Sequence, residues 1–111
     1  MKSIPKIIIT PGEPAGIGYD IILDISKKNF SADLISIASI ELLKERRDIL
    51  KKKVNFIKVD INDTDLPKIG DNDILVHDIK NTTKVKIGSP NIKHVPLILE
   101  SLDIGINACL G

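Results

Sequence analysis

The most constraining feature of the sequence is a short run of isoleucines that ends abruptly in a bend rich in proline and glycine. Residues 7–9 follow Lys6 without alternation of polar and apolar side chains, and the bend begins at Thr10. An unbroken β-branched run of this length is typical of a strand buried on both faces, as in a parallel sheet. The start of the chain therefore predicts a parallel α/β architecture.

Apolar residues return after the bend at helical spacing. Ile17, Ile21, Ile22 and Ile25 would form one stripe on a helix that is expected to end at Asn29. The sequence thus places a helix directly after the first strand and its bend.

A second helix is predicted over residues 40–50. Ile40, Leu43, Arg47 and Leu50 recur at helical spacing, with the stem of Arg47 lying along the apolar stripe. The rest of the chain predicts strands at 34–38, 54–59 and 73–77, a loop at 60–72, either a loop or a short edge strand (84–87) within 81–90, and a long helix at 91–110 with Ile98, Leu102, Ile106 and Cys109 on one side.

The order strand, helix, strand, helix, strand, strand, helix predicts an α/β fold: an open, mostly parallel sheet with helices on its faces. A βα chain that ends in a helix is expected to continue into another strand, so we expect the sheet to be incomplete after Gly111. An incomplete sheet would leave an open edge and an uncovered face, so the isolated chain should aggregate or be marginally stable.

Composition excludes several functions. The 111 residues are 42% hydrophobic and 28% charged with a net charge of +1, which gives no strong field for recruiting nucleic acid or an acidic membrane. Basic residues cluster between Lys44 and Lys53, but acidic residues are interleaved with them, which favours a solvated helix face. No signal peptide or membrane span is recognisable, so a cytoplasmic location is expected.

The bend between the first strand and helix is the best candidate for a functional segment. In an open parallel sheet, ligands bind outside the carboxyl ends of the strands, where this bend must lie. It lacks the Gly-Lys-Ser/Thr of a phosphate-binding loop, and Ile21 occupies the third glycine position of the dinucleotide fingerprint. From the residues alone, a structural turn and a ligand-lining loop are equally supported.

The segment from Thr10 to Asp20 resembles the opening motif of 4-hydroxythreonine-4-phosphate dehydrogenases, T-P-G-D/E-P-A-G-I-G-P-D/E, with Tyr19 where that family usually has proline. Weaker similarity continues through residues 42–46, Gly88 and residues 100–102. The chain departs from the family pattern near Ser39 and near residues 94–95, where an Asn-Gly step usual in the family is absent. A looser likeness extends to isocitrate and isopropylmalate dehydrogenases.

The resemblance implies that residues 1–111 are the amino-terminal part of a larger two-domain α/β dehydrogenase. Such enzymes are cytoplasmic homodimers that use NAD or NADP and a divalent metal (zinc, magnesium or cobalt). They oxidise 4-phosphohydroxy-L-threonine to a β-keto acid, which decarboxylates to 3-amino-2-oxopropyl phosphate in the biosynthesis of pyridoxal phosphate (vitamin B6). The family's metal ligands and most cofactor contacts lie beyond this chain, so the chain alone is expected to be inactive. Weak candidates to line the cleft are Gly12, Glu13, Gly16 and Gly18, with no catalytic role assigned.

The remaining reactive side chains favour structural interpretations. His77 ends a predicted strand and is expected to be packed or hydrogen-bonded, whereas His94 is expected to be exposed. Two histidines without an acidic motif between them do not make a metal site. Cys109 is expected to be a small buried residue, and the acidic residues Asp71, Asp73 and Asp78 are expected to be solvated.

Two other functions remain open at this point. The chain could be a stand-alone, non-catalytic α/β binding module. It could also belong to a related hydroxy-acid dehydrogenase of the isopropylmalate type, although Pro14-Ala15 before Gly16 favours the vitamin B6 enzyme.

Overall fold

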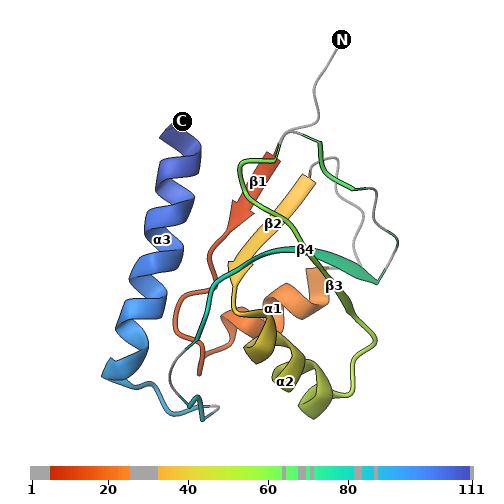
Figure 1. The fold of residues 1–111 in the computed structure, drawn as a ribbon. Helices are drawn as coiled ribbons and strands as arrows, with labels where there is room; N and C mark the ends of the chain where they lie inside the picture. Colours follow the sequence, from red (N-terminus) through yellow and green to blue (C-terminus); the bar gives the residue numbers. More distant parts are fainter. Residues whose placement is uncertain are drawn as a thin grey trace.

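Four parallel strands form the centre of the computed structural model, which describes residues 6–25, 33–63, 65–67, 70, 72–81, 84–86 and 88–110 (Figure 1). The strands lie in the order β1-β2-β4-β3, and every pairing is parallel. Their bounds are β1 (Lys6–Ile9), β2 (Asp33–Ala38), β3 (Asn55–Lys58) and β4 (Asp73–Asp78). The predicted α/β fold with a parallel sheet is confirmed, as are all four predicted strands.

Helices pack against both faces of this sheet. They are α1 (Gly18–Ile25), α2 (Ile40–Leu50) and α3 (Val95–Leu110), and a short 3-10 turn, η1 (Ile92–His94), leads into α3. Arg47 of α2 lies over Phe56 of β3, whereas Gly105 of α3 lies against Ile8 and Ile37. Ile37 pairs with His77 of β4, and Phe56 pairs with Ile74 of the same strand. His77 and Ile74 are three positions apart and therefore face opposite sides of the sheet, so α2 and α3 cover opposite faces.

The first strand is less buried than the isoleucine run predicts. β1 lies at an edge of the described sheet and pairs only with β2, so Ile7 keeps 47% of its surface exposed. The prediction of a strand buried on both faces is therefore wrong for β1. Among the described strands, β2 and β4 occupy the centre and carry the fully buried residues, including Ile35, Ile37 and Val76.

The helix faces also differ from the predicted stripes. In α1, Tyr19, Ile22 and Leu23 are buried, whereas Ile17 and Ile21 are exposed. The predicted helix end at Asn29 lies outside the described residues. The predicted buried side of α1 is therefore correct for Ile22 but wrong for Ile17 and Ile21. The helix instead buries Tyr19 and Leu23.

In α2, the buried arginine is Arg46 rather than Arg47. Leu42, Leu43 and Arg46 face the core, and Leu50 is exposed. The helix begins where the Ser39 side chain accepts a hydrogen bond from the backbone N–H of Leu42 at 3.3 Å, a typical N-cap. Apart from Arg46, the basic residues of this region lie on a largely solvated face, as predicted.

The carboxyl-terminal part contains two further corrections. Residues 84–86 form no strand, so the edge strand considered for 84–87 is absent from the part of that segment that the structure describes. In α3, Leu97 and Gly105 face the sheet, whereas Leu102, Ile106 and Cys109 lie together but remain exposed. The expected burial of Cys109 is wrong. None of the described helices is long and apolar enough to cross a membrane.

Candidate functional site

The bend of residues 10–17 lies at the edge of the sheet where the parallel strands end. The chain leaves β1 and β2 for helices on one face, but after β4 it leads to α3 on the other face. Ligands of open α/β sheets bind where the connections change sides in this way, which here is between β2 and β4. Ile79 donates to the Ala38 carbonyl at 3.1 Å and Ile40 donates to Asp78 Oδ1 at 2.9 Å, so the two strand ends are joined directly.

The glycines of the bend have distinct structural roles. Gly12 has a φ of 79°, a conformation that other residues adopt only with strain. A Cβ at Gly18 would lie 2.0 Å from the Pro11 carbonyl oxygen, and one at Gly16 would lie 3.3 Å from the Glu13 carbonyl oxygen. Gly18 therefore permits a backbone contact that no side chain would allow.

Arg46 fastens the bend to α2. Its guanidinium donates to the carbonyl oxygens of Gly16 at 3.0 Å and Pro14 at 2.7 Å, and to Asp20 Oδ1 at 2.7 Å. The Arg46 side chain is 5% exposed and the Asp20 side chain 35% exposed, so the cation is withdrawn from water while its partner remains partly solvated. Arginine suits this position because its fork of donors can satisfy several fixed oxygens at once.

Glu13 joins the bend to the start of α3. Its Oε1 accepts from the backbone N–H of Ala15 at 3.1 Å and also contacts Nδ1 of His94. His94 is only 1% exposed, and its Nε2 lies 3.3 Å from the carbonyl oxygen of Lys84. The expectation of an exposed His94 is wrong, because its ring fills the space between the bend and the segment before α3.

Tyr19, the departure from the family motif, links α1 to the start of α2. Its ring is 1% exposed, and its hydroxyl accepts a hydrogen bond from the backbone N–H of Ser39 at 3.2 Å. Burial raises the pKa of the Tyr19 hydroxyl above its ordinary value of 10.0, because the charged phenolate is disfavoured away from water. A proline here could not supply this acceptor to Ser39.

Together these contacts describe a bend held from three sides, by Arg46, by His94 and by Gly88, whose N–H donates to the Ala15 carbonyl at 2.8 Å. Sequence reasoning missed Arg46 and His94. The helical spacing of apolar residues in α2 is compatible with burial of either Arg46 or Arg47, so it could not identify Arg46. Of the four cleft candidates, Gly12 has open space where a Cβ would stand, whereas Gly16 and Gly18 are packed against the bend itself. Contact of Gly12, Glu13, Gly16 or Gly18 with a ligand stays a prediction.

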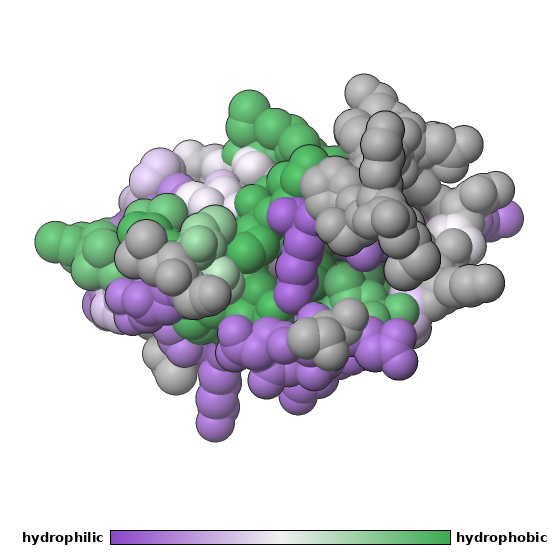
Figure 2. Space-filling model, turned by 90° about the horizontal axis from the view of Figure 1, so that it is seen from above, coloured by the Kyte–Doolittle hydropathy of each residue, from purple (hydrophilic) through white to green (hydrophobic). Residues whose placement is uncertain are grey.

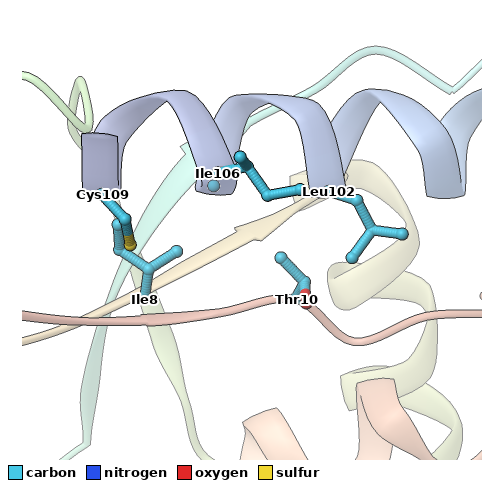
Figure 3. A pocket seen from close by; sticks show the side chains of 6 residues that line it. Ile8, Thr10, Leu102, Ile106 and Cys109 are labelled. Atoms are coloured by element: carbon cyan, nitrogen blue, oxygen red, sulfur yellow. The ribbon is translucent and has the colours of Figure 1, made fainter. Parts of the chain in front are cut away.

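Two cavities flank α3 on the opposite side of the sheet from α1 and α2. One, of about 290 Å³, is apolar and lies between β1 and the helix, with Leu102, Ile106 and Cys109 facing Ile8 and Thr10 (Figure 3). The other, of about 260 Å³, is more polar and includes Asp60, Asn62, His77 and Asn107. His77 accepts a hydrogen bond at Nδ1 from the N–H of Ile61 at 2.9 Å, which confirms that it is hydrogen-bonded.

The described residues do not fit the metal that the resemblance implies. Among them, no three His, Cys, Asp or Glu side chains gather to hold an ion. Asp73 accepts from the N–H of Gly70 at 2.9 Å and Asp78 from that of Ile40, so both carboxylates support the backbone, whereas Asp71 lies outside the described residues. Asp73 and Asp78 are both partly buried, so the expectation of a solvated cluster is wrong for these two residues.

Comparisons with known proteins agree with the motif. The chain is 32% identical over its full length to a 4-hydroxythreonine-4-phosphate dehydrogenase of Wigglesworthia glossinidia brevipalpis, of which it covers 32%. It is 31% identical, over 89% of its length, to the protein of the same name from Pseudoalteromonas translucida, of which it covers 30%. The chain thus spans about a third of the length of the curated relatives it matches. No protein-family model matches it.

The fold has a solved counterpart. A chain from Salmonella typhimurium, assigned as a 4-hydroxythreonine-4-phosphate dehydrogenase, superposes with a TM-score of 0.81 over 97% of this chain and 34% of its own length, at 19% identity. Fold and bend define an open parallel α/β unit with a proline- and glycine-rich turn at the carboxyl ends of its strands. Both sequence relatives carry the name 4-hydroxythreonine-4-phosphate dehydrogenase, and the chain fits an amino-terminal fragment of such a protein.

Proposed function

We propose that residues 1–111 form the amino-terminal part of a two-domain, NAD(P)-dependent 4-hydroxythreonine-4-phosphate dehydrogenase. The complete enzyme would oxidise 4-phosphohydroxy-L-threonine to a β-keto acid, which loses carbon dioxide to give 3-amino-2-oxopropyl phosphate for pyridoxal phosphate synthesis. A cytoplasmic homodimer is part of the same proposal. The observation that carries it is the match of the whole chain, bend included, to a relative of that name.

The contribution of this part would be to hold the bend at the carboxyl edge of the sheet. Arg46 fixes the backbone of the bend from one side and His94 fixes Glu13 from the other, which leaves Gly12 beside open space. A rigid bend of this kind can present backbone groups to a substrate without moving when the substrate binds. Gly12 and Glu13 are therefore the positions at which we expect a ligand to meet this part of the enzyme.

The 111 residues alone are expected to be inactive. The described residues offer no set of donors that would hold a divalent metal, and the bend lacks the third glycine of a dinucleotide fingerprint. The chemistry would then depend on groups supplied by the other part of a family-length polypeptide.

A chimera tests the proposal. Residues 1–111 would replace the matching segment of the Wigglesworthia relative, and NAD(P)H formation would be followed with 4-phosphohydroxy-L-threonine. We expect turnover by the chimera and none by the 111-residue chain alone. A chimera carrying Gly18→Ala should lose activity because the added Cβ would overlap Pro11, whereas one carrying Lys44→Gln, at an exposed position, should not.

Two outcomes would contradict the proposal. A chimera that melts cooperatively and has the subunit composition of the active relative, yet neither turns over nor rescues a pyridoxine-requiring strain, would exclude the assigned function. Turnover by the 111 residues alone would refute the expectation that this part is inactive.

A further inference from the structure

The two histidines of the chain are held in opposite ways. His77 accepts a hydrogen bond at Nδ1 from the N–H of Ile61 at 2.9 Å, so that nitrogen cannot carry a proton. His94 has an oxygen beside each ring nitrogen: Glu13 Oε1 at Nδ1 and the Lys84 carbonyl, 3.3 Å away, at Nε2. A carbonyl oxygen and an ionised carboxylate can only accept, so both contacts are hydrogen bonds only if both nitrogens of His94 are protonated.

From this geometry we propose that His94 is a positioning residue that holds the bend in place while its ring is doubly protonated and releases the bend when it loses a proton. The inference concerns a protonation-controlled contact within this chain, and it does not depend on the proposed enzymatic function.

The contacts around His94 connect three separate segments. Glu13 Oε1 also accepts from the N–H of Ala15, and the carbonyl of Ala15 accepts from the N–H of Gly88 at 2.8 Å. His94 reaches back to Lys84, a few residues before Gly88, and so completes the connection between the bend and the segment that precedes α3. The protonated ring therefore acts on Ala15 and Gly88 without touching either of them.

The charged groups near Glu13 do not compete with His94 for its carboxylate. Arg46, the buried cation on the other side of the bend, donates to Asp20 and to the carbonyls of Pro14 and Gly16. Lys84 and Lys93 are exposed residues, and of the two only the Lys84 carbonyl contacts the ring. The Glu13 side chain is 25% exposed against 1% for His94, so Glu13 can turn toward water whereas the ring cannot.

Loss of one proton would leave a nitrogen lone pair facing an oxygen at the buried ring. Either the Glu13 contact or the Lys84 contact would then become repulsive, and the bend would separate from the segment before α3. The contact therefore requires an ionised Glu13 and a His94 ring that carries both protons, and it weakens when the ring loses either proton.

Nuclear magnetic resonance of the ¹⁵N-labelled 111-residue chain tests this directly. Two-bond correlations of the imidazole nitrogens, recorded from about pH 5 to about pH 8, distinguish the charged ring from the neutral one. We expect His94 to show two protonated nitrogens wherever the amides of Ala15 and Gly88 exchange slowly. Amide exchange at Ala15 and Gly88, corrected for its intrinsic pH dependence, should rise at least about tenfold as His94 loses its proton, the scale of one charge-assisted hydrogen bond.

Three variants separate positioning from general stability. Glu13→Gln and His94→Gln keep side chains of similar size but remove one charge each, so the pH-dependent step in Ala15 and Gly88 exchange should disappear in both. His77→Gln should keep the step, because Nδ1 of His77 accepts from the N–H of Ile61 and not from the bend. The same peptides can be followed in the chimera by exchange and mass spectrometry.

A singly protonated His94 in the folded wild-type chain across the whole range would overturn the inference. So would an exchange step that persists in Glu13→Gln. The wild-type spectra decide the first point even if a variant fails to fold, and neither result bears on whether the chimera turns over substrate.

Discussion

The two faces of the sheet are packed in different ways. On the face covered by α1 and α2, Tyr19, Ile22, Leu23 and Leu43 are essentially excluded from solvent. Polar groups on this face also have partners: Arg46 binds the bend, and Tyr19 accepts from Ser39. Apolar filling and hydrogen bonding thus support the same arrangement, which is characteristic of a well-specified core.

The face covered by α3 is filled less completely. The helix approaches the sheet at Gly105, where no side chain can fill the interface, and a cavity lies on each flank of the helix. Leu102 and Ile106 remain 40% and 57% exposed, and hydrophobic side chains reach the surface among hydrophilic ones in Figure 2. The comparison shows that the same sheet can be tightly specified on one face and retain room for further packing on the other.

Adding one methyl group at Gly18, where α1 meets the bend, and another at Gly105 of α3 should give opposite results, and this is the largest effect that we expect. Gly18→Ala should destabilise the chain by roughly 3 kcal/mol, because its Cβ would lie 2.0 Å from a backbone oxygen. Gly105→Ala should stabilise it by about 0.5–1 kcal/mol, because alanine favours the helix and its nearest neighbour, the Thr10 methyl at 3.4 Å, borders a cavity. Urea unfolding measures both changes. Destabilisation by Gly105→Ala would show that the α3 face is as tightly packed as the other.

Arg46 and Arg47 provide the next test, since they are adjacent in sequence but differently engaged. Arg46→Met should cost roughly 2–3 kcal/mol, because the carbonyls of Pro14 and Gly16 would lose their partner. Arg47→Met should cost at most about 1 kcal/mol, because its guanidinium stacks over Phe56 at 5.4 Å in a partly exposed position. Equal losses in thermal or urea unfolding would contradict the assignment of Arg46 as the residue that holds the bend.

Tyr19 tests the hydrogen bonding on the same face. Tyr19→Phe should cost about 1–2 kcal/mol, because the buried N–H of Ser39 would lose its acceptor. Since burial raises the pKa of Tyr19 in the folded chain, the unfolded chain ionises first as pH rises. The stabilisation linked to this group is therefore complete below about pH 10 and is lost as pH rises through the folded pKa. The alkaline fall in unfolding free energy should be shallower in Tyr19→Phe; identical pH profiles would argue against a buried hydroxyl.

The sequence predicted the elements better than their orientation. Strands and helices were recognisable because β-branched runs, helical spacing and the proline–glycine bend are local signals. For α2, however, stripes through Arg46 or through Arg47 both fit a period of 3.6 residues, and only the position of the bend decides between them. Cys109 was misassigned for the same reason, since an apolar helix side need not be the side that faces the sheet.

His94 could not have been placed by local reasoning. Its burial depends on Glu13, 81 residues earlier, and on a carbonyl from the irregular segment before α3. The location of the bend at the carboxyl edge was predictable, because every parallel strand followed by a crossover helix turns there. The contacts that hold the bend come from parts of the chain that are distant in sequence, so local sequence patterns do not predict them.

The smallest effect on stability that we expect concerns the exposed flank of α3. Ile106→Lys should change unfolding free energy by no more than about 0.5 kcal/mol, because Ile106 is already 57% exposed. It should nevertheless reduce self-association in sedimentation experiments, because Ile106 borders the apolar cavity next to the edge strand β1. Ile49→Lys is the matched control: Ile49 is 62% exposed on α2 and gains the same charge on the face that α1 and α2 cover. If both variants reduced association equally, net charge would be the cause; a specific effect of Ile106→Lys would identify the α3 flank as the surface through which these chains associate.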